Sequence, residues 1–303
     1  MENKMLEILN IGSLNIDHVY QVPHFVLPGE TLTSSSYARN AGGKGLNQSI
    51  ALARASSLHD SIKVAHGGKI GADGSFLKEL LAFEGVETSS VLTGDTPTGH
   101  AIIQVDTTGQ NNIILYPGAN RQLTRPELEE MLAACPKGSW ILLQNEINEI
   151  PFIMEQAHAR GLHIAINPAP CGPEVADYPI QLADVLFVNE IEAAQLAQMP
   201  FDTAEEKLLD ALVDRYPNTE IVLTLGANGA LYRFKQERIF TPAVQVKAVD
   251  TTSAGDTFIG YFLAARMNGA SPATAMEHAT KASAITVTRK GAAVSIPKAN
   301  ELA

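Results

Sequence analysis

The sequence predicts an α/β protein in which a doubly wound, mainly parallel sheet has helices on both faces and carries a small β-sheet lid. Three observations predict this fold. Short apolar runs alternate with helix-length amphipathic segments almost from end to end, which favours parallel strands connected by helices. Two segments interrupt this alternation and are typical of β-structure. No repeat, low-complexity tract or linker divides the chain, so we expect a single domain over residues 1–303, with lid segments at approximately 14–38 and 96–117.

The apolar runs define the strands expected in the main sheet. They are Leu6–Ile11, Lys63–His66, Trp140–Gln144, His163–Ile166, Val185–Val188 and Ile221–Leu225. The amphipathic segments expected to form helices are Gln48–Ser56, Ser75–Glu84, Arg125–Ala134, Ile150–Arg160, Glu190–Gln198, Ala204–Arg215 and Ile259–Met267.

The two interrupting segments are expected to pair as the small sheet. Residues 18–37 show little helical periodicity and contain two prolines. The β-rich runs 101–106 and 112–116 are joined through T-T-G at 107–109, which is typical of a hairpin. Such an appendage could cover a site as a lid, and an ordinary surface meander is the alternative.

The charge balance excludes some classes of partner. The chain has 22 basic and 33 acidic residues and a net charge of −11, whereas binding a nucleic-acid backbone needs a broad basic surface. A nucleotide substrate is compatible, because bound Mg²⁺ and a few donors can neutralise its phosphates. The N-terminus does not resemble a signal peptide, and no run approaches the ~20 apolar residues of a membrane helix. We therefore expect no nucleic-acid or membrane partner and a cytoplasmic location.

Polar residues follow five of the predicted strands. They lie at 12–17, 144–146, 167–170, 189–190 and 224–229. Ligands of open parallel sheets bind beyond the carboxyl ends of the strands, so we expect one polar ligand site at this edge.

Glycine-rich segments add a candidate site and a candidate turn. Residues 39–47, R-N-A-G-G-K-G-L-N, allow close backbone approach and suit a polyhydroxylated ligand, although a tight strand-to-helix turn is the alternative. They do not form a phosphate-binding G-x-x-x-x-G-K-[ST] loop. Residues 67–71, G-G-K-I-G, are interpreted as a tight turn only.

A third segment, V-D-T-T-S-A-G-D-T-F at 249–258, runs directly into a predicted helix. Small residues at a helix start leave N–H groups free and the helix dipole adds positive potential, so the segment predicts an anion site. Asp256 within it could be an ordinary helix-start carboxylate. Beside an anion site it could equally accept a proton from an alcohol that attacks phosphorus.

Ten segments, in their order along the chain, form a specific signature. They are G-S-L-N-I-D-H at 12–18, P-G-E-T at 28–31, A-G-G-K-G-L-N-Q at 41–48, Y-P-G-A-N at 116–120, L-L-Q-N-E at 142–146, N-P-A-P at 167–170, V-N-E-I-E at 188–192, T-L-G-A-N-G at 224–229, V-D-T-T-S-A-G-D-T-F at 249–258 and V-T-R-K-G-A at 287–292. With them the chain resembles the ribokinase-like (phosphofructokinase-B) family of carbohydrate kinases over nearly its whole length. The resemblance implies a parallel α/β domain whose β lid also makes a homodimer contact.

The resemblance also implies functions for matching residues. Asp256 would be the catalytic base, and the N–H groups around Ala254, Gly255 and Asp256 would form the anion hole. The implied sugar-binding residues are Asn15, Asp17, Gly43, Lys44, Asn47, Glu146 and Asp256. On the nucleotide side, Asn189 and Glu192 would interact with Mg²⁺ and phosphate. The other implied nucleotide-side residues are Thr224, Leu225, Gly226, Ala227, Asn228, Gly229, Gly255 and Thr280.

A monovalent-cation site filled by K⁺ is implied as well. The matching residues are Asp250, Thr252, Thr286, Arg289, Gly291 and Ser295. Most would contribute backbone carbonyls, and the cation would brace the loop that carries the anion hole.

The implied activity is transfer of the γ-phosphoryl group of ATP to the primary hydroxyl of a small sugar, with Mg²⁺ and K⁺ as cofactors. D-ribose, giving ribose 5-phosphate, is the leading substrate. The chain departs from the family pattern at Ser253, where glycine is frequent, and at Asn145, where hydrophobic residues are frequent. The alternatives are a kinase for 2-deoxyribose, another sugar or a nucleoside and, more remotely, a non-catalytic sugar-binding regulator.

Overall fold

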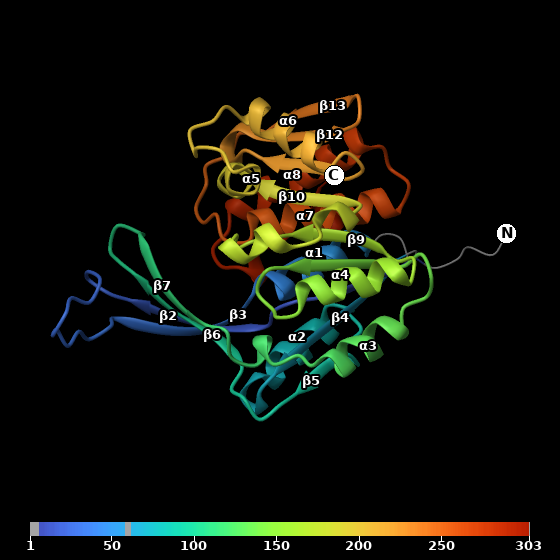
Figure 1. Cartoon of the computed structure of the whole chain (residues 1–303). Coiled ribbons are helices and arrows are strands. Elements are labelled where there is room, and N and C mark those ends of the chain that lie inside the picture. The colour runs from blue at the N-terminus through green and yellow to red at the C-terminus, as the bar shows by residue number, and fades with distance from the viewer. Residues whose placement is uncertain (1–5, 58–61, 303) are drawn as a thin grey trace.

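The structure, a computed structural model, describes residues 6–57 and 62–302 and contains a large and a small β-sheet (Figure 1). The large sheet has nine strands in the order β13-β12-β11-β10-β9-β8-β1-β4-β5. Their bounds are β1 Leu6–Ile11, β4 Ile62–Ile70, β5 Val91–Thr93, β8 Trp140–Gln144, β9 His163–Asn167, β10 Val185–Asn189, β11 Glu220–Thr224, β12 Gly229–Phe234 and β13 Glu237–Pro242. Only β12 and β13 pair antiparallel with their neighbours. The predicted mainly parallel sheet is confirmed.

The order of the strands reverses between β1 and β8. From β1 the chain moves outward through β4 to β5, whereas β8 begins a second series through β9, β10 and β11 to the antiparallel edge. Open α/β sheets bind ligands in the crevice at such a reversal, beyond the carboxyl ends of the strands. The ends of β1 and β8 therefore mark the expected centre of a site.

Helices cover both faces of the large sheet, as predicted. The helices α1 Lys44–Ser56, α2 Ser75–Phe83, α7 Ala254–Met267 and α8 Pro272–Val287 pack on one face. The helices α3 Arg125–Ala133, α4 Ile150–Ala159, α5 Glu190–Ala197 and α6 Glu205–Arg215 pack on the other. Ile8 and Leu9 of β1 belong to opposite cores, as the alternation of side chains along a strand requires. No helix within 6–57 and 62–302 combines the length and apolar character needed to cross a membrane.

The small sheet projects from the side of this layered body (Figure 1). Its strands are β2 Asn15–Gln21, β3 Ser36–Gly42, β6 Gly99–Val105 and β7 Asn111–Tyr116, in the order β3-β2-β6-β7. The small sheet and the hairpin of β6 and β7 are confirmed. Strand β3 continues to Gly42, past the predicted segment end near 38, and leads directly into α1.

Several predicted elements differ from the structure. Residues 67–70 are not a tight turn, because β4 continues through them and Gly68 pairs with Val91 of β5. The glycines here permit close packing, since a Cβ on Gly68 would lie 2.8 Å from the Gly12 carbonyl oxygen. Helix α1 begins at Lys44 and α7 at Ala254, both earlier than predicted. Strands β5, β12 and β13 and helix α8 were not predicted from the sequence.

Helices α1 and α7 are in close backbone contact. A Cβ built on Gly260 of α7 would lie 2.4 Å from the Cβ of Ala51 and 2.8 Å from the backbone nitrogen of Leu52, both in α1. The Leu52 nitrogen is part of the backbone and the Ala51 Cβ is bonded directly to it, so neither atom can move unless α1 itself shifts. The absence of a side chain at Gly260 therefore sets how closely the two helices approach.

We expect Gly260→Ala to lower the free energy of unfolding by about 1–3 kcal/mol, the usual effect of overpacking. It should do so although alanine has the higher helix propensity. The measurement is chemical denaturation. Gly94→Ala is the matched control, because its added Cβ would meet only the flexible end of Lys69. A Gly260→Ala protein as stable as the parent would contradict the account of this contact.

Candidate active site

The five strand ends predicted to carry polar residues lie side by side. They belong to β1, β8, β9, β10 and β11, which are consecutive neighbours in the sheet. All five strands run parallel, so their carboxyl ends share one edge. The structure thus brings the candidate residues of these five loops to one side of the domain.

The glycine-rich turn lies against the end of β1 and the loop after β8. Gly43 has a φ of 96°, a left-handed conformation that favours glycine. The Lys44 N–H donates to Glu146 Oε2 at 3.0 Å, and the Ser13 hydroxyl donates to the same oxygen. These bonds fix the Glu146 carboxylate beside the turn.

A small polar pocket opens where the lid joins the domain. Its volume is about 50 Å³, and its lining residues are Asn15, Leu115, Pro117, Asn120, Arg121, Asn145, Glu146 and Pro170. Asn15 Oδ1 accepts a hydrogen bond from Asn120 Nδ2 at 2.7 Å. Burial and, secondly, the nearby Glu146 carboxylate raise the pKa of Asp17 to about 7. The base of the lid and the loop after β8 therefore form one polar, partly acidic surface.

Asp256 lies in the first turn of α7, facing α1. Its side chain is buried, with 6% of the residue exposed. Asn47 Nδ2 donates to Asp256 Oδ2 at 3.0 Å, and Gln48 Nε2 donates to Oδ1 at 2.9 Å. Each carboxylate oxygen thus accepts a hydrogen bond from an amide, which satisfies the buried charge and fixes the plane of the group. Asn47 Oδ1 is buried without a partner among the described residues, so it can still accept a hydrogen bond from a ligand.

The backbone around Asp256 leaves room for an anion. Ser253 precedes the helix with φ 58° and ψ 10°, a left-handed conformation that is uncommon for serine. The first N–H groups of a helix have no intrahelical acceptor. A Cβ on Gly255 would meet no atom within 4 Å, so the approach to the N–H groups of Gly255 and Asp256 is open, whereas the Ala254 N–H donates to the Thr251 carbonyl at 3.3 Å. The geometry fits an anion at the start of α7.

Lys44 is the cation nearest to the candidate carboxylates. Burial lowers its pKa, but the negative charges of Asp256, Glu146 and Glu192 outweigh burial and raise it. Lys44 therefore carries its charge throughout the physiological pH range. Burial is the main cause that raises the pKa of Glu192. The Lys44 ammonium accordingly offsets negative charge from three acidic groups of the site.

Asn189 and Glu192 cap the N-terminus of α5. Glu192 N donates to Asn189 Oδ1 at 2.9 Å, and Asn189 N donates to Glu192 Oε2 at 3.0 Å. This is a capping box, in which both side chains have a structural function. Within 6–57 and 62–302, no group of three or more His, Cys, Asp and Glu side chains has the arrangement of a metal site.

The predicted nucleotide-side segment follows β11. Thr224 ends the strand, and Gly226 begins a short helical turn, Gly226–Asn228, with a φ of 52°. A Cβ on Gly226 would meet no atom within 4 Å, so a ligand can approach this backbone closely. Gly229 has a φ of 119° and returns the chain into β12. Thr280, on α8, has a buried hydroxyl without a partner among the described residues.

The residues matched to a cation site lie in the loop before α7 and in the segment from the end of α8 to residue 295. Asp250 Oδ2 accepts from the Gly291 N–H at 2.9 Å, and Oδ1 accepts from the N–H and hydroxyl of Thr252. Ser295 lies 3.4 Å from the Ser253 hydroxyl. The hydroxyl of Thr286 donates to Thr257, and Arg289 donates to Glu301. The structure therefore brings 250–252 and 291–295 together, directly before α7.

Two polar residues of the site were not predicted from the sequence. Ser13 and Asn120 bond to Glu146 and Asn15, yet neither was assigned a function. Asn120 lies within Y-P-G-A-N, so that motif was the available signal. Asn145 lines the small pocket, but its amide bonds to the Pro170 carbonyl, Glu174 and Tyr178. Its main contacts thus hold the neighbouring loop.

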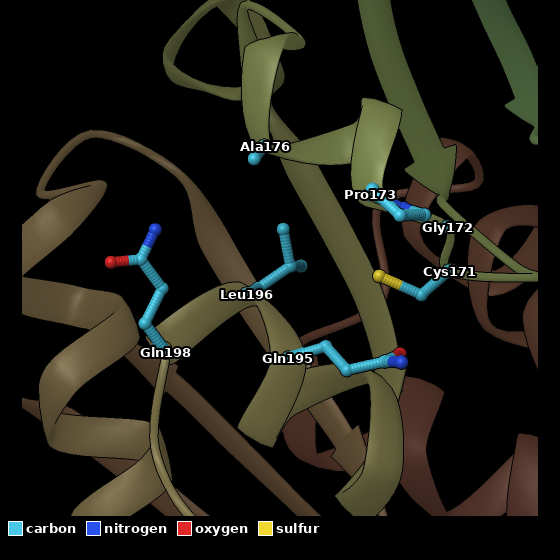
Figure 2. Close-up of a pocket in the computed structure, with 7 residues that line it drawn as sticks. All are labelled: Cys171, Gly172, Pro173, Ala176, Gln195, Leu196 and Gln198. Carbon is cyan, nitrogen blue, oxygen red and sulfur yellow. The ribbon is translucent and has the colours of Figure 1, made fainter.

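A second pocket, of about 240 Å³, lies outside this site (Figure 2). Its lining residues are Cys171, Gly172, Pro173, Ala176, Gln195, Leu196 and Gln198. The Leu196 side chain and the Cys171 sulfur point into it (Figure 2). Burial raises the pKa of Cys171 to about 11, so the thiol stays protonated. Without a charged lining residue or a reactive thiol, this pocket has less catalytic chemistry than the strand-end site, although it is larger.

Known proteins resemble the chain over almost its full length. Residues 5–299 match the family described as pfkB family carbohydrate kinase. A ribokinase from Haemophilus influenzae is 35% identical over 297 residues, covering 96% of this chain and 95% of the relative. A deoxyribokinase from Salmonella typhi is 31% identical and covers 96% of each chain. The crystal structure of a ribokinase from Cryptococcus neoformans in complex with ADP has a TM-score of 0.82 and 33% identity, with 98% of each chain covered.

The family match spans both sheets and every loop of the strand-end site. The relatives agree with it in sequence, and the solved structure agrees with it in fold. The chain therefore belongs to the pfkB family of carbohydrate kinases.

Proposed function

We propose that this carbohydrate kinase transfers the γ-phosphoryl group of ATP to the primary hydroxyl of D-ribose, giving ribose 5-phosphate. The observation that carries the proposal is the Asp256 carboxylate, buried at the start of α7 and held by two amide donors. The full-length similarity to ribokinases supports ribose as the sugar.

In the proposed reaction Asp256 is the general base. The primary hydroxyl oxygen bonds to the γ-phosphorus, the bond from phosphorus to the ADP oxygen breaks, and the hydroxyl proton moves to Asp256. A carboxylate retains lone pairs beside the two that Asn47 and Gln48 occupy, so it can still accept this proton. The N–H groups around Ala254, Gly255 and Asp256 would bind the phosphoryl oxygens as charge develops.

The sugar would lie between the lid and the ends of β1 and β8. Asp17 can accept hydrogen bonds from two adjacent hydroxyls. Asn15 and Glu146 line the small pocket, and the Glu146 carboxylate is close enough to Asp17 to raise its pKa. Asn47 Oδ1, buried and without a partner among the described residues, would accept from a further hydroxyl. Gly43 and Lys44 would complete the sugar site through the turn before α1. Closure of the lid would exclude water and so limit hydrolysis of ATP.

ATP would bind across the turn after β11. The residues proposed for it are Thr224, Leu225, Gly226, Ala227, Asn228, Gly229 and Thr280, with Gly255 at the phosphates. Gly226 fits this function because its backbone is open to close approach. The Lys44 ammonium would offset phosphate charge from the side of the sugar.

Two metal ions are part of the proposal. Mg²⁺ would neutralise the phosphates of ATP. Because Asn189 and Glu192 bond to each other as a helix cap, they fit contact with Mg²⁺ through water better than direct ligation. K⁺ would bind where 250–252 adjoin 286–295, and the bonds from Gly291 and Thr252 to Asp250 already order that region. The ion would hold the loop before α7 in place.

The lid supports a proposal of homodimerisation. Strand β7 is exposed along its whole length, including Ile113 and Leu115 at 53% and 46%. Ala101 pairs with Asp17 on one side and with Leu115 on the other, so the three side chains lie on the same face of the lid sheet. The exposed apolar side chains Ile113 and Leu115 therefore adjoin the proposed sugar site. A second copy of the chain would cover it. A cytoplasmic location remains a prediction from the sequence.

A kinase for 2-deoxyribose is the second candidate, favoured by the 31% identical deoxyribokinase. The test is ADP release with ribose, 2-deoxyribose, other sugars and nucleosides, each with and without K⁺. We expect the highest kcat/KM with ribose and stimulation by K⁺. A protein that turns over only 2-deoxyribose would overturn the assignment of the sugar. Ribose binding without turnover of any acceptor would instead indicate a regulator.

Replacement of Asp256 by asparagine tests the base. We expect Asp256→Asn to reduce kcat by at least about 10²–10⁴-fold, because the amide cannot accept the proton. Ribose affinity, measured by calorimetry, should stay within about tenfold of the parent. Asp210→Asn, on the exposed side of α6, is the control. Full activity in Asp256→Asn would exclude Asp256 as the base.

The raised pKa of Asp17 predicts that sugar binding depends on pH. The ionised carboxylate accepts two hydroxyl hydrogen bonds, whereas the protonated group loses part of that capacity. With a pKa of about 7, Asp17 becomes protonated as the pH falls, so the KM for ribose should rise as the pH falls from about 8 to about 6. In Asp17→Asn the KM should be high and nearly independent of pH. A KM for the parent that stays constant over this range would contradict the assignment.

A further inference from the structure

Behind Asp256, three buried amide side chains connect α1 to β1 and β8, the two strands at the reversal of strand order. Gln48 of α1, Gln144 of β8 and Asn10 of β1 are each 0% exposed. Gln48 Nε2 donates to Asp256 Oδ1 at 2.9 Å. Gln144 Nε2 donates to Gln48 Oε1 at 2.7 Å and to Asn10 Oδ1 at 3.0 Å. We call these three residues the amide relay.

The orientation of each amide in the relay follows from a single backbone carbonyl. Asn10 Nδ2 donates to the Gly45 carbonyl at 2.8 Å, and a carbonyl can only accept. Asn10 must therefore turn Oδ1 towards Gln144, which must present its nitrogen. Gln48 must then turn Oε1 towards Gln144 and its N–H towards Asp256. A flip of any one amide would place two acceptors or two donors face to face.

Neutral groups also end the relay at its far side, although Gln144 Oε1 and His66 Nε2 are buried without a partner among the described residues. Asn10 Nδ2 donates to Ser49 Oγ at 2.9 Å, and Ser49 Oγ lies 2.8 Å from His66 Nδ1. Complete burial lowers the pKa of His66 to about 4, so its ring is neutral, and one hydrogen bond joins it to the serine hydroxyl. The relay therefore presents a fixed dipole to Asp256 without adding a charge.

The backbone is shaped to admit these side chains. A Cβ on Gly12 would lie 2.3 Å from Gln144 Oε1 and 2.7 Å from the Cα of Gly45. Apolar side chains of similar size would fill this space at little cost in stability, because buried hydrogen bonds contribute modestly when both partners are replaced. A polar path that ends on the carboxylate of Asp256 indicates a function beyond packing.

We propose that Gln48 and Gln144 are positioning residues for phosphoryl transfer. The relay obliges Gln48 to present an N–H to Asp256. A hydrogen bond of this kind stabilises the ionised form of a carboxylate and fixes its direction, here towards the sugar hydroxyl. This inference rests on the proposed function of Asp256 as the base. Gln48 acts directly on the carboxylate, and Gln144 acts through Gln48.

The test is the pH dependence of kcat at saturating ribose and ATP. Loss of a hydrogen bond to the ionised form raises the pKa of a carboxylate, so in Gln48→Met the acid limb should move up by about one pH unit. In Gln144→Met, Gln48 keeps its amide but is free to rotate, so the acid limb should move up by only about half a pH unit. In both variants kcat should recover at alkaline pH to within about threefold of the parent. Lys44 and Glu192, the charged groups that interact with Asp256, are unchanged, so their influence is common to all profiles.

Two further variants complete the design. Gln48→Glu keeps the size of the side chain and should move the acid limb up as well, since it places a second carboxyl beside Asp256. Gln48→Glu replaces Gln48→Met in the test if thermal denaturation shows that Gln48→Met is unfolded. Gln156→Met is the matched control, because the Gln156 side chain, on α4, accepts a hydrogen bond from Arg160 at the end of that helix and should leave the profile unchanged.

The outcomes separate failure of the relay from failure of the base. Acid limbs that coincide with the parent in the Gln48 and Gln144 variants would overturn the relay. A kcat lowered equally at every pH would overturn it too, because that result indicates a packing defect. If Asp256→Asn is inactive in either case, the base assignment stands and only the relay fails. If Asp256→Asn is active, the base assignment fails, and the relay fails with it.

Discussion

A buried carboxylate needs hydrogen-bond donors, and this requirement at Asp256 governs the arrangement of the site. The donors, Asn47 and Gln48, come from α1, so α1 must lie close against the start of α7. Gly260 permits this approach by leaving room for Ala51. The hydrogen bonds to the Asp256 carboxylate therefore depend on how α1 and α7 pack. A shift of either helix would leave the carboxylate without partners.

The course of the chain explains how the rest of the site assembles around that carboxylate. After β1 the chain enters the lid through β2, returns through β3, and passes the glycine-rich turn at Gly43 into α1. The base of the lid, the glycine-rich turn and α1, whose side chains bond to Asp256, are thus consecutive in the chain. Strand β8, beside β1 at the reversal of strand order, adds Gln144, and the loop after it adds Glu146. Groups that would bind the sugar and groups that orient the base consequently share the same short stretch of backbone.

The fold could be predicted from local patterns, whereas the contacts of the site depend on pairings distant in sequence. Alternating apolar runs gave the parallel strands, and the polar residues after them lie on one edge as expected. Glycines 67 and 68 misled the prediction, because close packing on neighbouring backbone requires glycine within a strand as well as in a turn. Asp256 could be proposed as a base, yet its donors could not be identified, since 208 residues separate it from Gln48. Asn10, a polar residue inside an apolar strand, was the one local sign of the relay.

The central claim is that Asp256 accepts the proton of the reacting sugar hydroxyl. A crystal structure of the protein with ribose and a non-hydrolysable ATP analogue tests it most directly. The account predicts the primary hydroxyl oxygen within about 2.6–3.2 Å of an Asp256 carboxylate oxygen, with both amide donors still bound to that carboxylate. A closed complex in which this hydroxyl faces another group, with Asp256 beyond hydrogen-bonding distance, would contradict it.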